Sequence, residues 1–509
     1  MFRGAKGVLG FLMVFGLVLS IVYGNAMGAA TFKSPIEGDP INLDPSQLSH
    51  TQDRLVAQQV YQGLVCFDYA ANPPYPVIPV LAKSYEVSKD GKMITFRLQQ
   101  GVQFHGGYGE MTSEDAVFSL QRHLDPKVAS AAKQELEDVD RIEAPDKYTV
   151  RIHLKLSSGL SLLRSLAFQN AGFVLSKKAV TSLEKKIERM PIGTGPFYFD
   201  RWNPGEKVIL KKFNNYWRTP PKVDEIEFWV IPEEIVAMGA LEKGDLDLSS
   251  MTKLGSYPRA KAMKGIQILE ARGGARAYTL YINNKMKPTD DLRVRRALAH
   301  ALDVKGICER LGPQVAPFPS PFAPVVFSAT DEFWKYDYNP EKAKQLLAEA
   351  GYPKGLELRV MYYNSDLFEP IALEVQRSFK TANVDLKLEY VEQAIWIKKF
   401  REFDTHLGVW SLARYVPYLF AEGYQTGAAR NYAKYSNPET DELIKKAKSA
   451  TTDEEAKKYW RDFQKKVTDD AVNFWVANGK SLVAVKNNVK GVVVMPTPGL
   501  YTLENASIQ

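Results

Sequence analysis

The chain has 509 residues, of which 45% are hydrophobic, 25% charged and 11% aromatic. This length is enough for two or three domains with substantial cores, and the composition excludes an intrinsically disordered chain. The formal charge of +7 is modest, and no basic cluster with interleaved aromatic residues marks a nucleic-acid surface. The short basic runs are therefore interpreted as solvated faces.

The first thirty residues have the order of a secretory signal peptide. Arg3 and Lys6 give a basic start, an apolar run extends from Val8 to Val22, and small residues follow it. The alternative is an uncleaved anchor helix, but the run is slightly short for a membrane span. We therefore expect residues 1–30 to be a signal peptide and the remaining chain to be exported.

The two cysteines are Cys66 and Cys308, and both stand in apolar stretches. Neither directly follows the leader, so we expect no lipid attachment there. Two buried free thiols are predicted, with a disulfide as the alternative in an oxidising compartment. Apolar surroundings raise the pKa of a thiol, so neither cysteine is predicted to be a nucleophile.

Short strands dominate the predicted elements before about residue 285. Alternating apolar residues predict a hairpin whose second strand includes residues 94–98, and Asp90-Gly91 supplies the positive φ angles of its turn. The same alternation predicts a strand over residues 150–154. Another strand, more buried, is predicted within the stretch VDEIEFWVI.

The stretch GTGPF, residues 193–197, has two glycines around a threonine, as in a loop that cradles phosphate. A dinucleotide fingerprint needs glycine where Tyr198 stands, and a Walker loop needs Gly-Lys-Ser/Thr. Pro196 has no N–H, which removes a phosphate donor. We therefore interpret the glycines as a requirement for tight backbone before a hairpin that turns at Pro204-Gly205.

Long helices dominate after residue 285. Asn339 is predicted to cap one helix, which Gly351 ends. Thr289 is predicted to cap the helix before it, and Thr452 a later one, with Glu455 completing a capping box. The change in element type indicates at least two lobes, with a glycine-rich crossing in the stretch RGGAR.

Catalytic motifs are not visible in the sequence. It contains no Gly-x-Ser-x-Gly elbow and no Cys-x-x-Cys, and no two of its six histidines stand at ligand spacing. We therefore predict no enzyme, no cofactor and no protein-bound metal. A metal carried as a chelate needs few protein ligands and stays open. An exported α/β protein of this kind is typical of a binder.

Several stretches along the chain carry a resemblance. They are INLDPSQLSHTQDRLVAQQVYQGLVCFD, PVLAKSYEVSKDGKMITFRLQQGVQFHGG, PIGTGPFYFDRWNPGEKVILKKFNNYW, DDLRVRRALAHALD, YNPEKAKQLLAEAGYPKGLEL and YSNPETDELIKKAK. In this order they resemble the extracellular solute-binding proteins of family 5, the dipeptide- and oligopeptide-binding class of ABC importers. The resemblance covers roughly residues 40 to 500.

The resemblance implies an α/β fold, a two-lobed periplasmic-binding-protein clamshell of type II with an additional inserted α/β domain. Lobe I is then discontinuous, with residues 31–68, 188–272 and 482–509. The insert takes residues 69–187 and lobe II residues 273–481. The ligand is expected between lobes that close by hinge bending, and the closed form is expected to dock on a membrane permease.

The implied function is that of an exported, periplasmic solute-binding protein. It captures a small ligand, above all a peptide, and delivers it to the permease subunits of an ABC transporter in the inner membrane. We expect a monomer with no nucleic-acid partner. The alternatives are an oligosaccharide, an opine-like anion or a metal chelate as ligand, a protein that presents its ligand to a chemosensor, and, least favoured, a secreted hydrolase.

Ligand contacts are expected around the stretch LGVWSLARYVPYLF. Peptide binders of this family commonly fix the ligand's amino terminus with an aspartate shortly after a Gly-Trp pair. Trp410 fits the tryptophan, but Arg414 replaces the aspartate. An arginine repels an ammonium and favours a carboxylate, so we expect an anionic or sugar-like group against Arg414, with a solvent-facing arginine as the alternative. Trp410, Tyr415 and Tyr418 would supply flat contact area.

Two further residues are candidate ligand contacts. Ser34 stands where the first strand leaves for the cleft, and Trp475 brings the chain back toward lobe I. Both positions are also typical of core residues.

Overall fold

The structure is a computed structural model that describes residues 30–130, 132–168, 171–363, 365, 367–402, 405–497 and 499–509, without the side chains of residues 397, 400 and 401. The predicted signal peptide, residues 1–30, lies outside the described residues except for Ala30. In these described ranges, no helix is long and apolar enough to cross a membrane.

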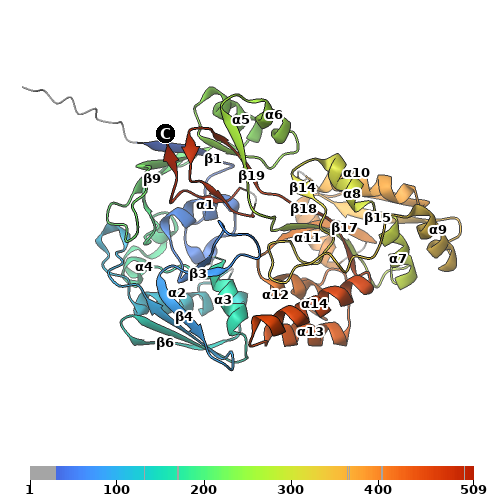
Figure 1. The fold of residues 1–509 in the computed structure, drawn as a ribbon, viewed down its shortest axis with the longest axis horizontal. Coiled ribbons are helices and arrows are strands. Elements are labelled where there is room, and N and C mark those ends of the chain that lie inside the picture. The colour runs from blue at the N-terminus through green and yellow to red at the C-terminus, as the bar shows by residue number, and fades with distance from the viewer. Residues whose placement is uncertain are drawn as a thin grey trace, which may run out of the picture.

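Figure 1 shows two bodies that meet near the centre of the molecule. The left body holds the N-terminal half of the chain and its C-terminus, which lies beside β1, while the right body holds most of the yellow and orange segments. The chain therefore returns at its end to the body that holds β1.

Two sheets form the part predicted as lobe I. In the first, β1 runs parallel to β10, and β9 and β8 follow antiparallel. In the second, β19 lies between β11 and β12. The strands are β1 (Thr31–Ile36), β8 (Phe197–Asn203), β9 (Lys207–Lys212), β10 (Glu225–Val230), β11 (Leu248–Ser250), β12 (Ile266–Glu270) and β19 (Leu482–Lys486). The helices are α1 (Thr51–Val60), α5 (Glu234–Lys243) and α6 (Ser256–Ala262).

The part predicted as the insert has a four-stranded antiparallel sheet in the order β4-β5-β7-β6. Its strands are β4 (Ala82–Val87), β5 (Met93–Leu98), β6 (Val139–Asp146) and β7 (Thr149–Leu154). Its helices are α2 (Ser113–Leu124), α3 (Gly159–Ala167), α4 (Lys177–Leu183) and the 3-10 turn η3 (Lys133–Leu136). The predicted hairpin is confirmed as β4–β5, and Gly91 in its turn has a φ of 67°.

The part predicted as lobe II has one six-stranded sheet in the order β14-β18-β13-β17-β15-β16. Its strands are β13 (Arg276–Ile282), β14 (Val315–Ala316), β15 (Leu356–Tyr362), β16 (Val384–Tyr390), β17 (Leu407–Ala413) and β18 (Asn473–Gly479). Its helices are α7 (Leu292–His300), α8 (Val304–Leu311), α9 (Pro340–Glu349), α10 (Phe368–Lys380), α11 (Gln393–Glu402), α12 (Pro417–Ala421), α13 (Pro438–Lys448) and α14 (Asp453–Asp469).

Short strand pairs complete the described elements. They are β2 (Val65–Phe67) with β3 (Val77–Pro79), β20 (Val489–Lys490) with β23 (Ser507–Ile508), and β21 (Val493–Val494) with β22 (Tyr501–Thr502). The β2–β3 pair joins residues on both sides of the predicted boundary after residue 68, whereas each larger sheet stays within one predicted part. The domain partition itself stays a proposal.

The predicted helix caps have mixed outcomes. Asn339 caps α9 by accepting from the Lys342 N–H at 3.0 Å, and Gly351 beyond the helix has a φ of 99°. Thr452 caps α14 by accepting from the Glu455 N–H at 3.2 Å. Both helices are therefore confirmed at their starts.

The prediction that Thr289 caps α7 is wrong. Its hydroxyl instead donates to the Asn283 carbonyl at 2.7 Å, and Asp291 accepts from the Arg293 N–H at 2.8 Å. The cause is a loop between strand and helix that is two residues longer than predicted. The predicted capping box of α14 is also displaced, because the Glu455 carboxylate accepts from Thr451 rather than from the cap.

The GTGPF glycines pack against the backbone at the end of α1. A Cβ on Gly193 would lie 2.1 Å from the Val60 carbonyl oxygen, and one on Gly195 would lie 2.6 Å from it. The Gly195 N–H donates to the same carbonyl at 2.8 Å. This confirms the requirement for tight backbone, and β8 and β9 turn at Gly205, where φ is 75°.

Two chain crossings join β12 to β13 and β18 to β19, and they pack against each other. A Cβ on Gly274 would lie 2.1 Å from the Gly479 carbonyl oxygen. The Asn478 side-chain amide donates to the Arg276 carbonyl at 2.9 Å. These two crossings are the segments about which we expect the predicted lobes to bend.

Both cysteines are free in the structure, as predicted. Cys308 is buried, whereas Cys66 is partly exposed, so the prediction of burial is correct for Cys308 alone. Burial raises the pKa of each thiol to about 12, which makes both poor nucleophiles at neutral pH.

Candidate functional site

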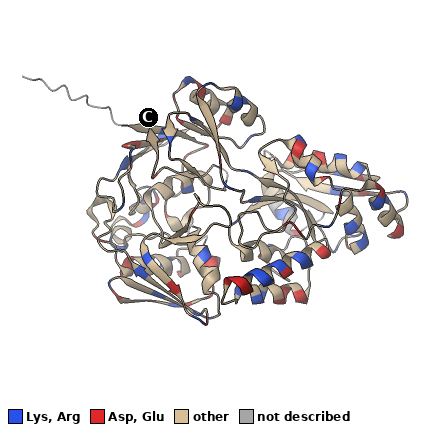
Figure 2. Ribbon diagram, in the orientation of Figure 1, with Lys and Arg blue, Asp and Glu red and all other residues tan. Residues whose placement is uncertain are grey.

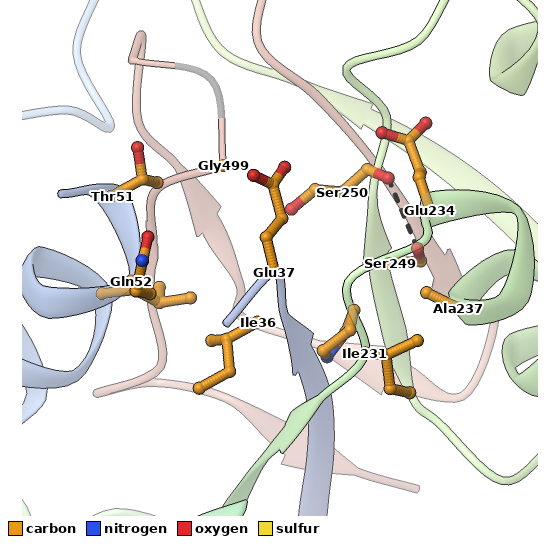
Figure 3. A pocket seen from close by; sticks show the side chains of 12 residues that line it. Ile36, Glu37, Thr51, Gln52, Ile231, Glu234, Ala237, Ser249, Ser250 and Gly499 are labelled. Atoms are coloured by element: carbon orange, nitrogen blue, oxygen red, sulfur yellow. Dashed lines mark hydrogen bonds between the residues drawn. The ribbon is translucent and has the colours of Figure 1, made fainter. Parts of the chain in front are cut away.

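An open recess lies at the carboxyl end of β1. Because β1 and β10 are parallel, their carboxyl ends meet at this edge, which is where open α/β sheets bind ligands. Figure 3 shows Glu37 between Thr51 of α1 and Ser250 of β11. The lining residues are Pro35, Ile36, Glu37, Thr51, Gln52, Leu55, Ile231, Glu234, Ala237, Ser249, Ser250 and Gly499.

The Glu234 carboxylate in this recess is already satisfied. It accepts from the Thr252 N–H at 2.9 Å and from the Thr252 hydroxyl at 2.5 Å. It also accepts from the Ser256 hydroxyl. We therefore assign Glu234 to holding the loop after β11 rather than to an incoming charge.

Arg54 lies one step along α1 from the residues that line the recess. Burial lowers the pKa of its guanidinium, and the charge of Glu135 opposes that change. Glu135 belongs to η3 of the insert, so this pair of charges joins lobe I to the insert. Sequence reasoning missed both residues.

Arg414 follows the last residue of β17 and is half-buried. Burial, and next the charges of Arg430 and Arg54, lower the pKa of its guanidinium to about 10, while Glu135 and Glu422 oppose the shift. Its Nη1 donates to the neighbouring Ala413 carbonyl at 3.0 Å. The environment of Arg414 is therefore rich in positive charge.

Glu422 is held from two sides. The Gln134 side-chain amide of the insert donates to its Oε1 at 2.9 Å, and Arg430 Nη1 lies 3.2 Å from its Oε2. Its two oxygens therefore have partners, which leaves Glu135 as the second carboxylate of the cluster.

Glu135 lies near three arginines without touching them. Burial raises the pKa of its carboxyl to about 7, although Arg414, Arg54 and Arg430 lower it. Among the residues that the structure describes, neither Glu135 nor Arg54 nor Arg414 forms an ion pair within 4.0 Å. The opposite charges of Glu135 and these arginines thus gather here without an ion pair within 4.0 Å among the described side chains.

Two polar atoms of these residues are buried and lack a hydrogen-bond partner within the described part of the chain. They are Nε of Arg54 and Oε2 of Glu135. Since native structures satisfy most buried polar atoms, such a pair indicates a place for water or for a ligand. Arg54, Glu135, Arg414, Arg430 and Glu422 are named here the charged cluster.

The predicted contact residues Tyr415 and Tyr418 lie where the parts meet. The Tyr415 ring is 4.5 Å from that of Phe168, between centroids, and stacks on Phe67 at 5.9 Å, and its hydroxyl is 2.7 Å from Thr497 Oγ1. The Tyr418 hydroxyl is 3.0 Å from Ser165 Oγ of α3. Figure 1 likewise shows α12 beside α3.

Trp410 is half-buried and stacks on Trp396 of α11, with 4.4 Å between ring centroids and 8° between planes. It also lies 6.1 Å from the Tyr363 ring. Sequence reasoning did not identify Trp396 or Tyr363, because an aromatic residue on a helix or strand is usually core. Whether this aromatic face touches a ligand stays a prediction.

Ser34 and Trp475 lie in the interior. Ser34 is fully buried and bonded to the Tyr501 hydroxyl. Trp475 is 1% exposed and donates from Nε1 to the Tyr424 hydroxyl at 3.1 Å. The structure therefore does not place them with the charged cluster, and their partners favour packing roles.

Charge on the rest of the surface is mixed. Figure 2 shows positive and negative residues interspersed along α13 and α14. Several of these pairs connect lobe II to the insert, including Arg164 with Asp453 at 2.8 Å and Lys448 with Glu137 at 3.0 Å. In the described ranges, no group of three or more His, Cys, Asp or Glu residues is arranged to hold a metal ion.

Comparisons with known proteins cover nearly the whole chain. The model of bacterial extracellular solute-binding proteins, family 5 Middle, matches residues 76–432. Heme-binding protein A of Haemophilus influenzae is 28% identical over 503 residues, covering 93% of this chain and 90% of that protein. Dipeptide-binding protein of Escherichia coli K12 is 28% identical over 511 residues, covering 93% and 94%.

A solved structure is similar across both lobes. MoaA from A. tumefaciens R10, in complex with mannopinic acid, has a TM-score of 0.75 and 26% identity, covering 94% of this chain and 100% of that chain. The predicted fold class, a type II clamshell with mixed α/β lobes, is confirmed.

Proposed function

Because this chain belongs to the bacterial extracellular solute-binding proteins of family 5, and so captures a solute for an ABC importer, we propose that its solute is a short peptide with a carboxylate that binds at the charged cluster. Members of this family are substrate-binding proteins rather than enzymes. A monomer exported to the periplasm without a lipid anchor is part of the same proposal.

The observation that carries the proposal is the gathering of arginines at the junction. Arg54 of α1, Arg414 at the end of β17 and Arg430 lie there, and the carboxylates whose charges act on them are Glu135 of the insert, Asp53 of α1 and Glu422 of the 3-10 turn η5 (Glu422–Tyr424). One of those carboxylates, Glu422, is engaged by neighbours. A ligand carboxylate would supply an acceptor for Arg54 and Arg414, neither of which forms an ion pair within 4.0 Å among the described residues.

Closure follows from this placement. Arg54 belongs to lobe I and Arg414 to lobe II, so a carboxylate between them is bound fully only when the lobes are together. Such a ligand binds the closed form better than the open form, which is the condition for shifting a hinge equilibrium. Tyr415 and Tyr418, which lie at the same junction, would cover the solute.

An opine-like acid is the second candidate solute. It shares the carboxylate that the charged cluster favours, and the similar binding protein MoaA was solved with mannopinic acid. The position of Arg414, where peptide binders of this family commonly have an aspartate, favours an acid over a ligand that is held by its ammonium alone.

The test is isothermal titration calorimetry with dipeptides such as alanyl-alanine and their C-terminal amides. We expect the free acids to bind and the amides to bind weakly. Arg414→Gln should weaken binding of the acid about 10- to 100-fold, the range for a lost hydrogen bond to a charged group.

Arg293→Gln is the matched control, because Arg293 is an exposed arginine on α7 paired with Asp291 at 2.7 Å. It should leave affinity unchanged. Equal binding of acid and amide, or full affinity in the Arg414 variant, would contradict the proposal. Binding of mannopinic acid but of no dipeptide would favour the second candidate.

A further inference from the structure

One face of α3 in the predicted insert is turned toward predicted lobe II. On the other side of this helix, Leu162, Leu163 and Leu166 are buried in the hydrophobic core. The face toward lobe II has residues at intervals of three, four and seven positions, a spacing that brings side chains onto one stripe of a helix. They are named here the α3 stripe and are Ser161, Arg164, Ser165 and the cap residue Phe168.

Arg164 stands in the middle of the α3 stripe. Its Nη2 lies 2.8 Å from Asp453 Oδ1 in the first turn of α14, and its Cζ lies 4.1 Å from the centroid of the Phe327 ring. The Arg164 side chain is only 14% exposed, so one partner of this ion pair is shielded from solvent, and salt screens such a pair less than a fully exposed one. Arg164 thus uses both its charge and its flat guanidinium surface against lobe II.

The other residues of the α3 stripe also contact lobe II. These contacts join Ser161 Oγ to the Lys448 carbonyl oxygen at 3.4 Å, Ser165 Oγ to the Tyr418 hydroxyl oxygen at 3.0 Å, and the Phe168 and Tyr415 rings at 4.5 Å between centroids. The partners come from α12, from the residues before it and from the end of α13. Every residue of the stripe therefore has a partner in lobe II.

Charged residues beside the α3 stripe have the opposite polarity. Glu137 directly follows η3 of the insert, and its Oε1 lies 3.0 Å from the Lys448 ammonium on α13. Asp138 Oδ2 lies 3.8 Å from the same ammonium. The insert therefore presents a positive charge to Asp453 and negative charges to Lys448. Such a crossed pattern favours one way of docking the two surfaces, because a shifted register would bring like charges together.

The insert is attached to lobe I by backbone pairing and by side chains. β2 of lobe I pairs with β3 of the insert, and His105 Nε2 of the insert lies 2.9 Å from the Gly195 carbonyl oxygen of lobe I. Arg122 of α2 also forms an ion pair with Asp44 of lobe I. We therefore expect the insert to move with lobe I, so the contacts of the α3 stripe must break when lobe II swings away.

The α3 stripe lies away from the crossings. Figure 1 shows α3 beside α12 and α14, below β18 and β19, whose connection is one of the two crossings. In a rotation about the crossings, two facing points separate in proportion to their distance from the axis. A small rotation therefore breaks the contacts of the α3 stripe, while it leaves the packing of Gly274 against Gly479 nearly unchanged.

We propose that the insert is a latch for closure: the α3 stripe, together with Glu137, docks on lobe II when the lobes close and holds them in that arrangement. The partners of the latch are residues of this chain, so its contribution is the same for every solute. Because charged pairs supply part of it, closure weakens as salt is added. This inference goes beyond the proposed function, since it gives the insert a role that does not depend on the solute.

The test is small-angle X-ray scattering of the full, solute-free protein in about 50 mM NaCl, where charges are weakly screened. Each curve is fitted as a mixture of this arrangement and of arrangements with lobe II rotated outward about the crossings. Arg164→Glu replaces attraction to Asp453 by repulsion, so we expect the closed-to-open ratio to fall about tenfold. Adding Lys448→Glu reverses the second pair and should lower the ratio by a further factor of about ten, which makes opening visible even in a protein that is almost entirely closed.

Arg164→Glu combined with Asp453→Arg tests the pairing itself. It restores opposite charges across the interface, so the scattering should return toward that of the wild type, which a general loss of stability would not produce. Arg293→Glu is the matched control, because it makes the same change of charge at an exposed arginine that pairs with Asp291 within lobe II at 2.7 Å. It should leave the closed-to-open ratio unchanged. Circular dichroism checks that each variant is folded.

Wild-type scattering in the variant with both pairs reversed would overturn the inference. So would an Asp453→Arg substitution that fails to restore closure in Arg164→Glu, or a wild-type ratio that stays constant between about 50 mM and 0.5 M NaCl. No solute enters these measurements, so their outcome is separate from that of the proposed function. A failure of dipeptides to bind leaves the latch standing, and a failure of the latch leaves binding at the charged cluster standing.

Discussion

Gly274 lies where the segment joining β12 to β13 packs against the segment joining β18 to β19. A substitution at Gly274 therefore measures how tightly these two segments are packed. A Cβ at this position would lie 2.1 Å from the Gly479 carbonyl oxygen and 2.3 Å from Asn478 Oδ1. An ordinary contact between carbon and oxygen is about 3.3 Å, so the crossings must separate by about 1 Å in Gly274→Ala. The φ of Gly274 is not positive, so the effect arises from the contact alone.

Overpacking of this kind costs typically about 1–3 kcal/mol, and a clash with backbone on a second strand belongs at the upper end. We expect Gly274→Ala to lower the free energy of unfolding in urea by about 3 kcal/mol and to weaken solute binding, because the lobes no longer meet at the same angle. The assays are urea denaturation followed by fluorescence and calorimetric titration.

Gly239→Ala is the control, because its Cβ would meet only the Arg259 Nη2 at 3.5 Å, an ordinary contact, within helix α5. It should be neutral or stabilising by up to about 1 kcal/mol. A Gly274 variant within about 0.5 kcal/mol of the wild type would refute the reasoning, since that is the range of an unconstrained surface position.

Three further predictions concern stability and closure. Burial lowers the pKa of His105 from 6.5 to about 4, so the unfolded chain takes up a proton at a higher pH than the folded protein does. The free energy of unfolding should therefore fall by up to about 3 kcal/mol between pH 6.5 and pH 4, and it should fall less in His105→Asn. If the wild type and His105→Asn lose the same free energy of unfolding in urea over this pH range, the prediction is contradicted. Phe322→Ala should cost about 3–5 kcal/mol in urea, because its fully buried ring contacts Trp460 and Phe463, and a loss below about 1 kcal/mol would argue against that packing. Lys448→Gln should weaken solute binding about two- to fivefold at low salt and less at 0.5 M NaCl, as expected for an exposed pair between insert and lobe II; a salt-independent loss would rule out this electrostatic origin.

Local patterns in the sequence predicted local structure well. The Asp-Gly turn, the Asn339 cap and the Thr452 cap each depend on residues only a few positions apart, and each is present. The Thr289 cap failed because the Thr289 hydroxyl donates to the Asn283 carbonyl, while Asp291, two residues later, caps the helix.

The charged cluster shows why the site was only partly predictable. Arg414 was found because it departs from a family pattern, but Arg54 and Glu135 are an ordinary helix residue and an ordinary acidic residue in the sequence. They gain meaning only when the insert and both lobes meet. For Ser34 the sequence suggested a ligand contact at the cleft, but its hydroxyl is buried and bonded to the Tyr501 hydroxyl.

The aromatic contact around Tyr415 has a thermodynamic consequence. Tyr415 is 2% exposed, and its ring is covered by Phe67, Tyr69 and Phe168, which come from outside lobe II. Any opening that separates these rings wets apolar surface, and closure removes it from water again. Closure therefore has a negative heat-capacity change, so the enthalpy of capture becomes more favourable as the temperature rises.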